Sequence, residues 1–171
     1  MNKSVILIGP PGAGKSTIGK QLARTLNCSF TDTDELIEAN TGSTISQIFI
    51  DQGEPRFREL EVEVVLKAVS EIDGVLSLGG GAPLSQPAQE LLQSISTPVI
   101  FLDVSLATAA PRVGFNRDRP LLLNNPRAAW QTLMEQRRPI YESIATHIVA
   151  VDGLTPREVA GKISEILGET T

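Results

Sequence analysis

The residues with the clearest chemistry lie close to the N-terminus, in the stretch Gly9-Pro10-Pro11-Gly12-Ala13-Gly14-Lys15-Ser16-Thr17. This stretch fits the pattern GxxxxGK[ST], follows the apolar run Val5-Ile6-Leu7-Ile8 and opens a helical pattern, which is the context that a phosphate-binding loop (P-loop) requires. Glycines let backbone N–H groups converge on phosphates, and the following helix adds the positive end of its dipole. A glycine turn with a chance lysine is the alternative, but it does not explain why strand, loop and helix coincide.

Each position of this loop has an expected task. The backbone of Gly12, Ala13 and Gly14 is expected to surround the phosphates. Lys15 would reach the β- and γ-phosphates as a point charge, the Ser16 hydroxyl would bind Mg²⁺, and Thr17 would extend the helix near the α-phosphate. The loop therefore predicts a site for a nucleotide together with Mg²⁺.

Two carboxylates follow the second expected strand, in Thr31-Asp32-Thr33-Asp34. One reading is structural, because Asp is a good N-cap and acidic residues favour a helix N-terminus. The chemical reading is that Asp32 holds Mg²⁺ through water, while Asp34 accepts a hydrogen bond from the hydroxyl that receives the phosphoryl group and takes or orients its proton. We favour the chemical reading, because the carboxyl end of this strand points toward the P-loop.

The third and fourth expected strands are also followed by unusual residues. Gly79-Gly80-Gly81 comes after the third strand, and because glycines cost conformational entropy we expect their backbone to approach a ligand closely. A plain turn is the alternative. Asp103 ends the fourth strand and looks like a Walker B aspartate, but it can instead cap the helix that begins near Ser105, and we favour the cap.

Arginines stand out in this acidic chain. Arg58 follows Phe57, with Phe49 nearby, which suggests a carboxylate clamp beside an apolar wall for a carbocyclic or sugar-like ring. Arg137 lies in a helical pattern and would supply the second half of the clamp.

A segment with little periodicity, residues 114–125, holds Arg117 and Arg119. We interpret it as a mobile loop over the site. Arg119 is placed to reach the transferring phosphoryl group when the loop closes, and Arg117 competes for this role.

The elements that must position these residues alternate along the chain. Short apolar runs predict strands at 4–8, 28–31, 75–78, 98–102 and 147–151, of which 28–31 is the weakest. Helical patterns cover 15–26, 33–40, 43–50, 53–70, 87–94, 105–112, 126–143 and 156–167. This alternation predicts a parallel, doubly wound α/β sheet in one domain, with ligands outside the carboxyl ends of the strands. His147, the sole histidine, begins a strand and is interpreted as structural.

Composition narrows the function class. With 171 residues, 41% hydrophobic content and a mean hydropathy of +0.02, the chain suits one globular domain. A net charge of −5 and a pI near 4.9 disfavour non-specific nucleic-acid binding. The single cysteine, Cys28, is interpreted as a small buried hydrophobe, and a His/Cys metal site is excluded. No leader or long apolar run is found, so we expect a cytoplasmic protein without a membrane partner.

Taken together, the P-loop, Asp32-Thr33-Asp34, Phe57-Arg58, Leu78-Gly79-Gly80-Gly81, Arg119-Pro120-Leu121-Leu122 and Arg137-x-Pro-x-Tyr141 resemble the shikimate kinase family. The resemblance covers nearly the whole chain. It implies a single P-loop kinase domain over 1–171: a three-layer α/β sandwich with helices on both faces of a five-stranded parallel sheet in the order 2-3-1-4-5. It also implies a mobile lid at about 113–125 and a shikimate-binding helical segment at about 33–61.

The resemblance further implies transfer of the ATP γ-phosphate to the 3-hydroxyl of shikimate, giving 3-phosphoshikimate on the route to chorismate and the aromatic amino acids. It assigns the roles as follows: Lys15, Asp34 and Arg119 in catalysis; Arg112, Pro156 and the P-loop around ATP; Asp34, Phe49, Phe57, Arg58, Gly79, Gly80, Gly81 and Arg137 around shikimate; Ser16 and Asp32 at Mg²⁺. Asp32 takes the place of the Walker B acid.

Two other functions compete with this one. The first is another small-metabolite kinase, acting on gluconate or a nucleotide. Gluconate carries a carboxylate too, but the aromatic wall suits a ring, and the three glycines favour shikimate. A nucleotide-binding switch would need an NKxD or DxxG element, and neither is suitably placed in the sequence. We expect a monomer, because no heptad pattern or long apolar stripe is present.

Overall fold

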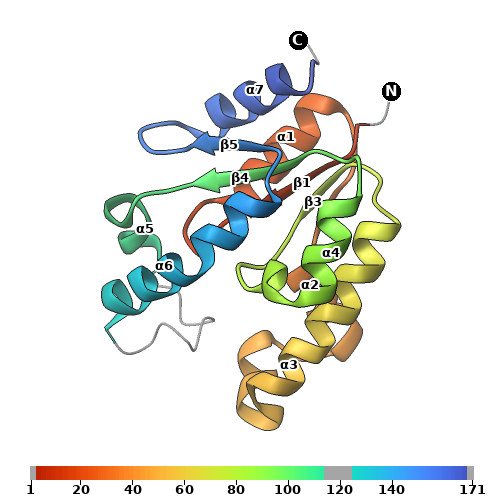
Figure 1. Cartoon of the computed structure of the whole chain (residues 1–171), viewed down its shortest axis with the longest axis vertical. Coiled ribbons are helices and arrows are strands. Elements are labelled where there is room, and N and C mark those ends of the chain that lie inside the picture. The colour runs from red at the N-terminus through yellow and green to blue at the C-terminus, as the bar shows by residue number, and fades with distance from the viewer. Residues whose placement is uncertain (1–2, 114–124, 169–171) are drawn as a thin grey trace.

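The computed structural model describes residues 3–113 and 125–168 of the chain. At its centre is a five-stranded sheet in the order β2-β3-β1-β4-β5, with every neighbouring pair parallel (Figure 1). The strands are β1 (Val5–Ile8), β2 (Phe30–Asp32), β3 (Val75–Ser77), β4 (Val99–Asp103) and β5 (His147–Ala150). The predicted fold class and strand order are confirmed.

Helices cover both faces of this sheet, as Figure 1 shows. On one face α1 (Lys15–Leu26) packs against α7 (Pro156–Ile166). On the other face lie α3 (Ile45–Ser70), α4 (Gln86–Ser94) and α6 (Pro126–Ile144), with the short 3-10 helix η1 (Ala82–Leu84) between them. α2 (Thr33–Thr41) packs on α3, and α5 (Leu106–Val113) packs on α6.

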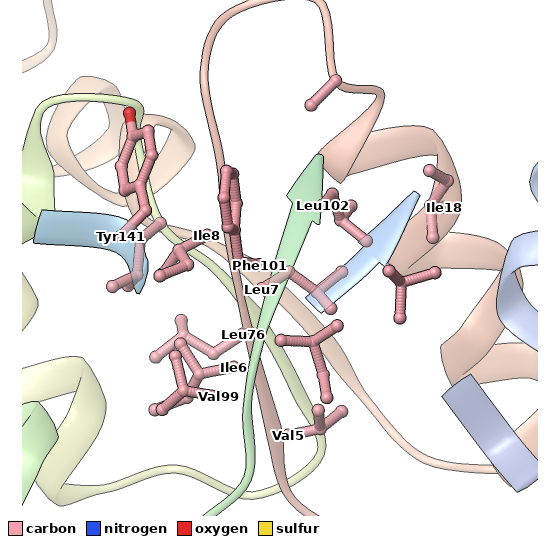
Figure 2. Close-up of a cluster of buried hydrophobic side chains, with 14 of the residues drawn as sticks. Val5, Ile6, Leu7, Ile8, Ile18, Leu76, Val99, Phe101, Leu102 and Tyr141 are labelled. Atoms are coloured by element: carbon pink, nitrogen blue, oxygen red, sulfur yellow. The ribbon is translucent and has the colours of Figure 1, made fainter. Parts of the chain in front are cut away.

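The core follows from the apolar runs of the central strands. Every side chain of β1, and every side chain of β4 before Asp103, has no solvent exposure. Strands covered on both faces read as continuous apolar runs in the sequence, which is why these two were easy to predict. Figure 2 shows this cluster, in which the rings of Phe101 and Tyr141 lie 5.2 Å apart and tie α6 to β4.

The long span of α3 is two helices joined at Gly53. This glycine has φ 81° and ψ 165°, a conformation outside the helical region that glycine adopts without steric cost. Pro55 follows at the start of the second helix, where its missing N–H is not needed. The predicted break between 50 and 53 is therefore confirmed, and it turns the second helix along the sheet.

The second strand begins later than predicted. Residues 27–28 form the turn that ends α1, because Asn27 is its left-handed C-cap (φ 52°) and the Cys28 N–H donates to the Ala23 carbonyl at 3.0 Å. Pairing with β3 begins at Phe30 and continues to Asp32, which lies opposite Ser77. Asp32 is consequently the last residue of the strand and not part of a following loop.

The expectation that Asp103 caps the following helix is wrong. Its two carboxylate oxygens accept hydrogen bonds from both terminal nitrogens of Arg138, at 2.8 and 3.1 Å. The capping position belongs to Ser105, whose hydroxyl accepts from the Thr108 N–H at 3.3 Å. A paired arginine on α6 competes more strongly for this carboxylate than a helix N-terminus does.

Candidate active site

The P-loop connects β1 to α1, and its lysine lies folded over the loop. Gly14, the N-cap of α1, has φ 84°. The Lys15 ammonium group donates to the carbonyl oxygens of Gly9 at 2.7 Å and Pro10 at 3.1 Å, and the residue is 8% exposed. A bound phosphate would therefore compete with two backbone carbonyls for this charge.

Ser16 and Asp32, the pair predicted at the metal, are in direct contact. The Ser16 hydroxyl donates to Asp32 Oδ2 at 2.6 Å, while Asp32 Oδ1 accepts from the Asp34 N–H at 2.8 Å and so caps α2. The structure thus shows the capping role of Asp32, and its role at the metal stays a prediction. Among the described residues, no group of three or more His, Cys, Asp or Glu side chains is arranged to hold a metal ion.

Asp34 lies at the start of α2 with its carboxylate against the glycine loop. A Cβ added to Gly79 would lie 2.6 Å from Asp34 Oδ1, so only glycine admits the carboxylate here. The Gly79 N–H donates to the Thr33 hydroxyl at 3.0 Å, and the Gly79 carbonyl accepts from the Ala82 N–H at 3.0 Å. Gly79 therefore contributes space to the site, because its own polar groups are used within the fold.

Arg58 reaches the other end of the glycine loop from α3. Its Nη1 donates to Glu61 Oε1 at 2.8 Å, and its Nη2 lies 3.3 Å from Glu54 Oε1. A side chain on Gly81 would collide with this guanidinium group, which also lies 5.2 Å from the Phe57 ring centre. Close approach of the Asp34 and Arg58 side chains explains Gly79 and Gly81, and the predicted approach of a ligand to this backbone stays a prediction.

Glu61 belongs to this site and was missed in the sequence. It is only 4% exposed, and burial raises the pKa of its carboxyl group although the neighbouring Arg58 acts in the opposite direction. Its Oε2 would lie 3.3 Å from a Cβ on Gly79, so it approaches the loop beside Asp34. The available signal was a carboxylate in the stripe Phe57, Glu61, Val65 and Val69, whose other members are all buried and apolar.

Arg137 comes to the middle of the glycine loop from α6. It is 4% exposed, and a Cβ on Gly80 would lie 3.0 Å from its Nη1. Within the described part of the chain, its buried Nε has no hydrogen-bond partner. A buried guanidinium group with an unused donor is suited to an anion, and a carboxylate matches its geometry.

Two cavities flank the glycine loop. One, of about 220 Å³, is lined by P-loop residues together with Asp32, Asp34 and Gly79. The other, of about 620 Å³, is lined by Arg58, Arg137, Gly81 and Glu61, with an apolar wall of Val62, Leu84, Ala129 and Leu133. Asp32 and Asp34 thus lie on the P-loop side, and on the far side the two arginines share a cavity with Glu54 and Glu61.

A third cavity, of about 260 Å³, lies beyond the P-loop. Arg112 and Pro156 line it together with Val151, Leu154 and Val159. The Arg112 Nη1 donates to the Gly12 carbonyl at 2.9 Å. The structure therefore brings together the two residues expected beside adenine.

Phe49 and Phe57 contact each other, with ring centres 4.8 Å apart. Phe57 is 4% exposed and forms a small second core with Ile37 and Ile48, against which Phe49 packs. Their role as the wall of a ring-binding pocket stays a prediction. Arg117 and Arg119, and with them most of the proposed lid, lie outside the described residues.

Comparison with known proteins decides the family. The family model described as Shikimate kinase matches residues 11–168. A shikimate kinase from Rhodococcus erythropolis is 49% identical over 164 residues, which cover 95% of this chain and 96% of the relative. The chain belongs to the shikimate kinase family.

Other relatives place the family likeness over the whole fold. A shikimate kinase from Salinispora arenicola is 46% identical, covering 95% of this chain and 96% of its own. The structure of shikimate kinase from Acinetobacter baumannii in complex with shikimate superposes with a TM-score of 0.92 at 35% identity, covering 98% of this chain and 94% of the other. No helix among the described residues of this family member has the length and apolarity needed to cross a membrane.

Proposed function

We propose that the chain transfers the γ-phosphate of ATP to the 3-hydroxyl of shikimate, giving 3-phosphoshikimate and ADP on the route to chorismate and the aromatic amino acids. Family membership over residues 11–168 supports the reaction type. The observation that carries the acceptor is the glycine loop, which has a carboxylate on its P-loop side and two arginines on its far side. This polarity suits a ring with a hydroxyl at one end and a carboxylate at the other.

The far side of the loop would bind the shikimate carboxylate. Arg137 offers a buried Nε–H that has no partner among residues 3–113 and 125–168, and Arg58 is held at Gly81 by Glu61. A carboxylate bound between two guanidinium groups makes charge-assisted hydrogen bonds, which are roughly twice as strong as neutral ones. We assign Arg58 and Arg137 to the clamp and Glu61 to holding Arg58, with the backbone of Gly80 and Gly81 closing the site.

The near side would align the reacting hydroxyl. Asp34 lies in the cavity that P-loop residues line, and we assign it to accept the hydrogen bond of the 3-hydroxyl and orient or take its proton. Phosphoryl transfer needs little covalent help from the protein, so alignment and charge neutralisation carry most of the catalysis. Lys15 would leave the Gly9 and Pro10 carbonyls for the γ-phosphate, and Arg119 would add its charge there.

The proposed metal is Mg²⁺, held at Ser16 and Asp32. The two side chains present oxygen donors 2.6 Å apart, and oxygen is the ligand that Mg²⁺ prefers. Bound with the nucleotide, Mg²⁺ supplies neutralisation of phosphate charge. With one hydroxyl and one carboxylate from the protein, the remaining ligands would be water and phosphate oxygens, as is usual for Mg²⁺.

The remaining assignments are proposals of the same kind. Arg112 and Pro156 would flank adenine, and residues near 113–125 would close over both substrates and exclude water. We propose a cytoplasmic monomer, without nucleic-acid or membrane partners, from the net charge of −5 and the absence of a heptad pattern in the sequence.

The direct test mixes the purified chain with Mg·ATP and shikimate, gluconate or nucleoside monophosphates, and measures ADP release with identification of the phosphorylated product. Of these acceptors, we expect only shikimate to give ADP release, and we expect the Asp34→Asn variant to lose this activity. Activity with another acceptor only would keep the kinase fold but overturn the acceptor. Substantial turnover by Asp34→Asn would overturn the role of Asp34, and gel filtration above the monomer size would overturn the monomer.

A further inference from the structure

One helix, α6, holds both loops of the proposed site. Near its start, the indole N–H of Trp130 donates to the Pro11 carbonyl of the P-loop at 2.7 Å, and the side chain is 4% exposed. Further along the same helix, the hydroxyl of Tyr141 donates to the Gly80 carbonyl at 2.6 Å, and that side chain has no exposure. The two donors are separated by about three helical turns.

The two loops that these side chains hold also contact each other. A Cβ on Gly80 would lie 3.3 Å from Pro11 Cδ and 3.6 Å from the Gly9 carbonyl oxygen. Arg137, which lies between Trp130 and Tyr141 on α6, also approaches Gly80: its Nη1 would lie 3.0 Å from the same Cβ. The helix therefore spans the place where the nucleotide loop and the acceptor loop meet.

The chemistry of Pro11 makes this hydrogen bond the natural way to fix the P-loop. Proline has no N–H, so the carbonyl is the backbone group by which a neighbour can hold its orientation. The bond is buried, and a buried carbonyl left without a donor costs more than the net strength of the bond. Gly80, without a side chain, is held in the same way through its carbonyl.

We propose that Trp130 and Tyr141 are positioning residues, Trp130 for the P-loop and Tyr141 for the glycine loop, and that α6 sets the separation between phosphoryl donor and acceptor. This inference rests on the proposed phosphoryl transfer. In-line transfer requires the reacting atoms to be held about 3–3.5 Å apart, and small misplacements are costly. A helix joined to both loops meets that requirement.

The variants Trp130→Phe and Tyr141→Phe remove one donor each and keep an aromatic ring. We expect Trp130→Phe to raise the KM for ATP about 3- to 10-fold and to lower kcat, with the KM for shikimate within about twofold of wild type. Tyr141→Phe should instead raise the KM for shikimate and leave the KM for ATP nearly unchanged. The control is Ile144→Val, a buried aliphatic change on the same helix, which should lower thermal stability and leave both KM values unchanged.

Fluorescence supplies a readout at the hydrogen bond between Trp130 and the P-loop. Trp130 is the only tryptophan in the chain, so its emission reports the indole that bonds to the P-loop. We expect Mg·ATP alone, without an acceptor, to change that emission. This measurement needs no variant, so it tests the coupling between Trp130 and the nucleotide site even if Trp130→Phe does not fold.

The outcomes separate the two proposals. Wild-type protein that fails to phosphorylate shikimate refutes the proposed function, and the ATP titration still tests Trp130. Wild-type protein that phosphorylates shikimate, with a Trp130→Phe variant of unchanged ATP kinetics or an emission insensitive to Mg·ATP, overturns the role of Trp130. Tyr141→Phe kinetics equal to those of Ile144→Val overturn the role of Tyr141.

Discussion

Gly79→Ala is the change that tests the site most sharply, because a single methyl group would be directed at Asp34. The new Cβ would lie 2.6 Å from Asp34 Oδ1, and that oxygen must move by roughly 0.8 Å to reach the 3.4 Å of ordinary van der Waals contact. The backbone itself tolerates alanine, because Gly79 is not among the residues with positive φ. The carboxylate gives way before the backbone does, since it is the end of a side chain.

The expected effect follows from that displacement. A misplacement of about 1 Å at a reacting group can cost on the order of 100-fold in rate. We therefore expect kcat to fall roughly 10- to 100-fold, with the KM for ATP nearly unchanged, because the P-loop is not touched. ADP release at saturating shikimate and ATP measures kcat, and thermal melting checks that the fold is retained.

Two other glycines provide matched comparisons. Gly81→Ala directs its methyl group at Arg58, so it should raise the KM for shikimate more than it lowers kcat. Gly161→Ala, in α7, meets no atom within 4 Å and should leave the kinetics unchanged while stabilising the helix by up to about 1 kcal/mol. A Gly79→Ala variant with kcat within about twofold of wild type would refute the placement of Asp34 at the reacting hydroxyl.

Three further predictions concern the charges of the site. Lys15→Met should abolish most turnover and leave the melting temperature near that of wild type, and retained turnover would contradict its role at the γ-phosphate. Arg58→Ala should raise the KM for shikimate roughly 10- to 100-fold by removing a charge-assisted clamp; an unchanged KM would count against the clamp. Because burial raises the pKa of Glu61 in the folded state, its contribution to stability is lost as pH rises from 4.5 through that raised pKa. Thermal melting of Glu61→Gln should therefore decline less over this range than wild type, and parallel profiles would contradict the shift.

The parts of this protein that sequence analysis predicted well are those with local causes. The P-loop combines glycines, a lysine and a hydroxyl within nine residues, and its context is a buried strand and a helix start. β1 and β4 are covered on both faces, so they appear as unbroken apolar runs. The break at Gly53 was visible because glycine and a proline two residues later interrupt an otherwise helical pattern.

The errors arose where a residue pairs with a partner that lies far away in the sequence. Asp103 had a plausible local task as a helix cap, but Arg138, 35 residues away, pairs with it. The second strand was placed too early because Cys28 and Ser29 have strand-like neighbours, while pairing with β3 starts at Phe30. Glu61 was missed in the sequence, because its place in the site comes from its contacts with the glycine loop and Arg58.

By itself, the sequence determined the fold class and the presence of a P-loop motif between a buried strand and a helix, because motif spacing and hydrophobic periodicity are local properties of the chain. Only the tertiary structure decided which atoms meet. It placed Asp34 against Gly79, buried Glu61 beside Arg58, and joined Trp130 to Pro11 across 119 residues. Such pairings depend on how α3 and α6 pack against the carboxyl edge of the sheet, and packing is settled by the whole core at once.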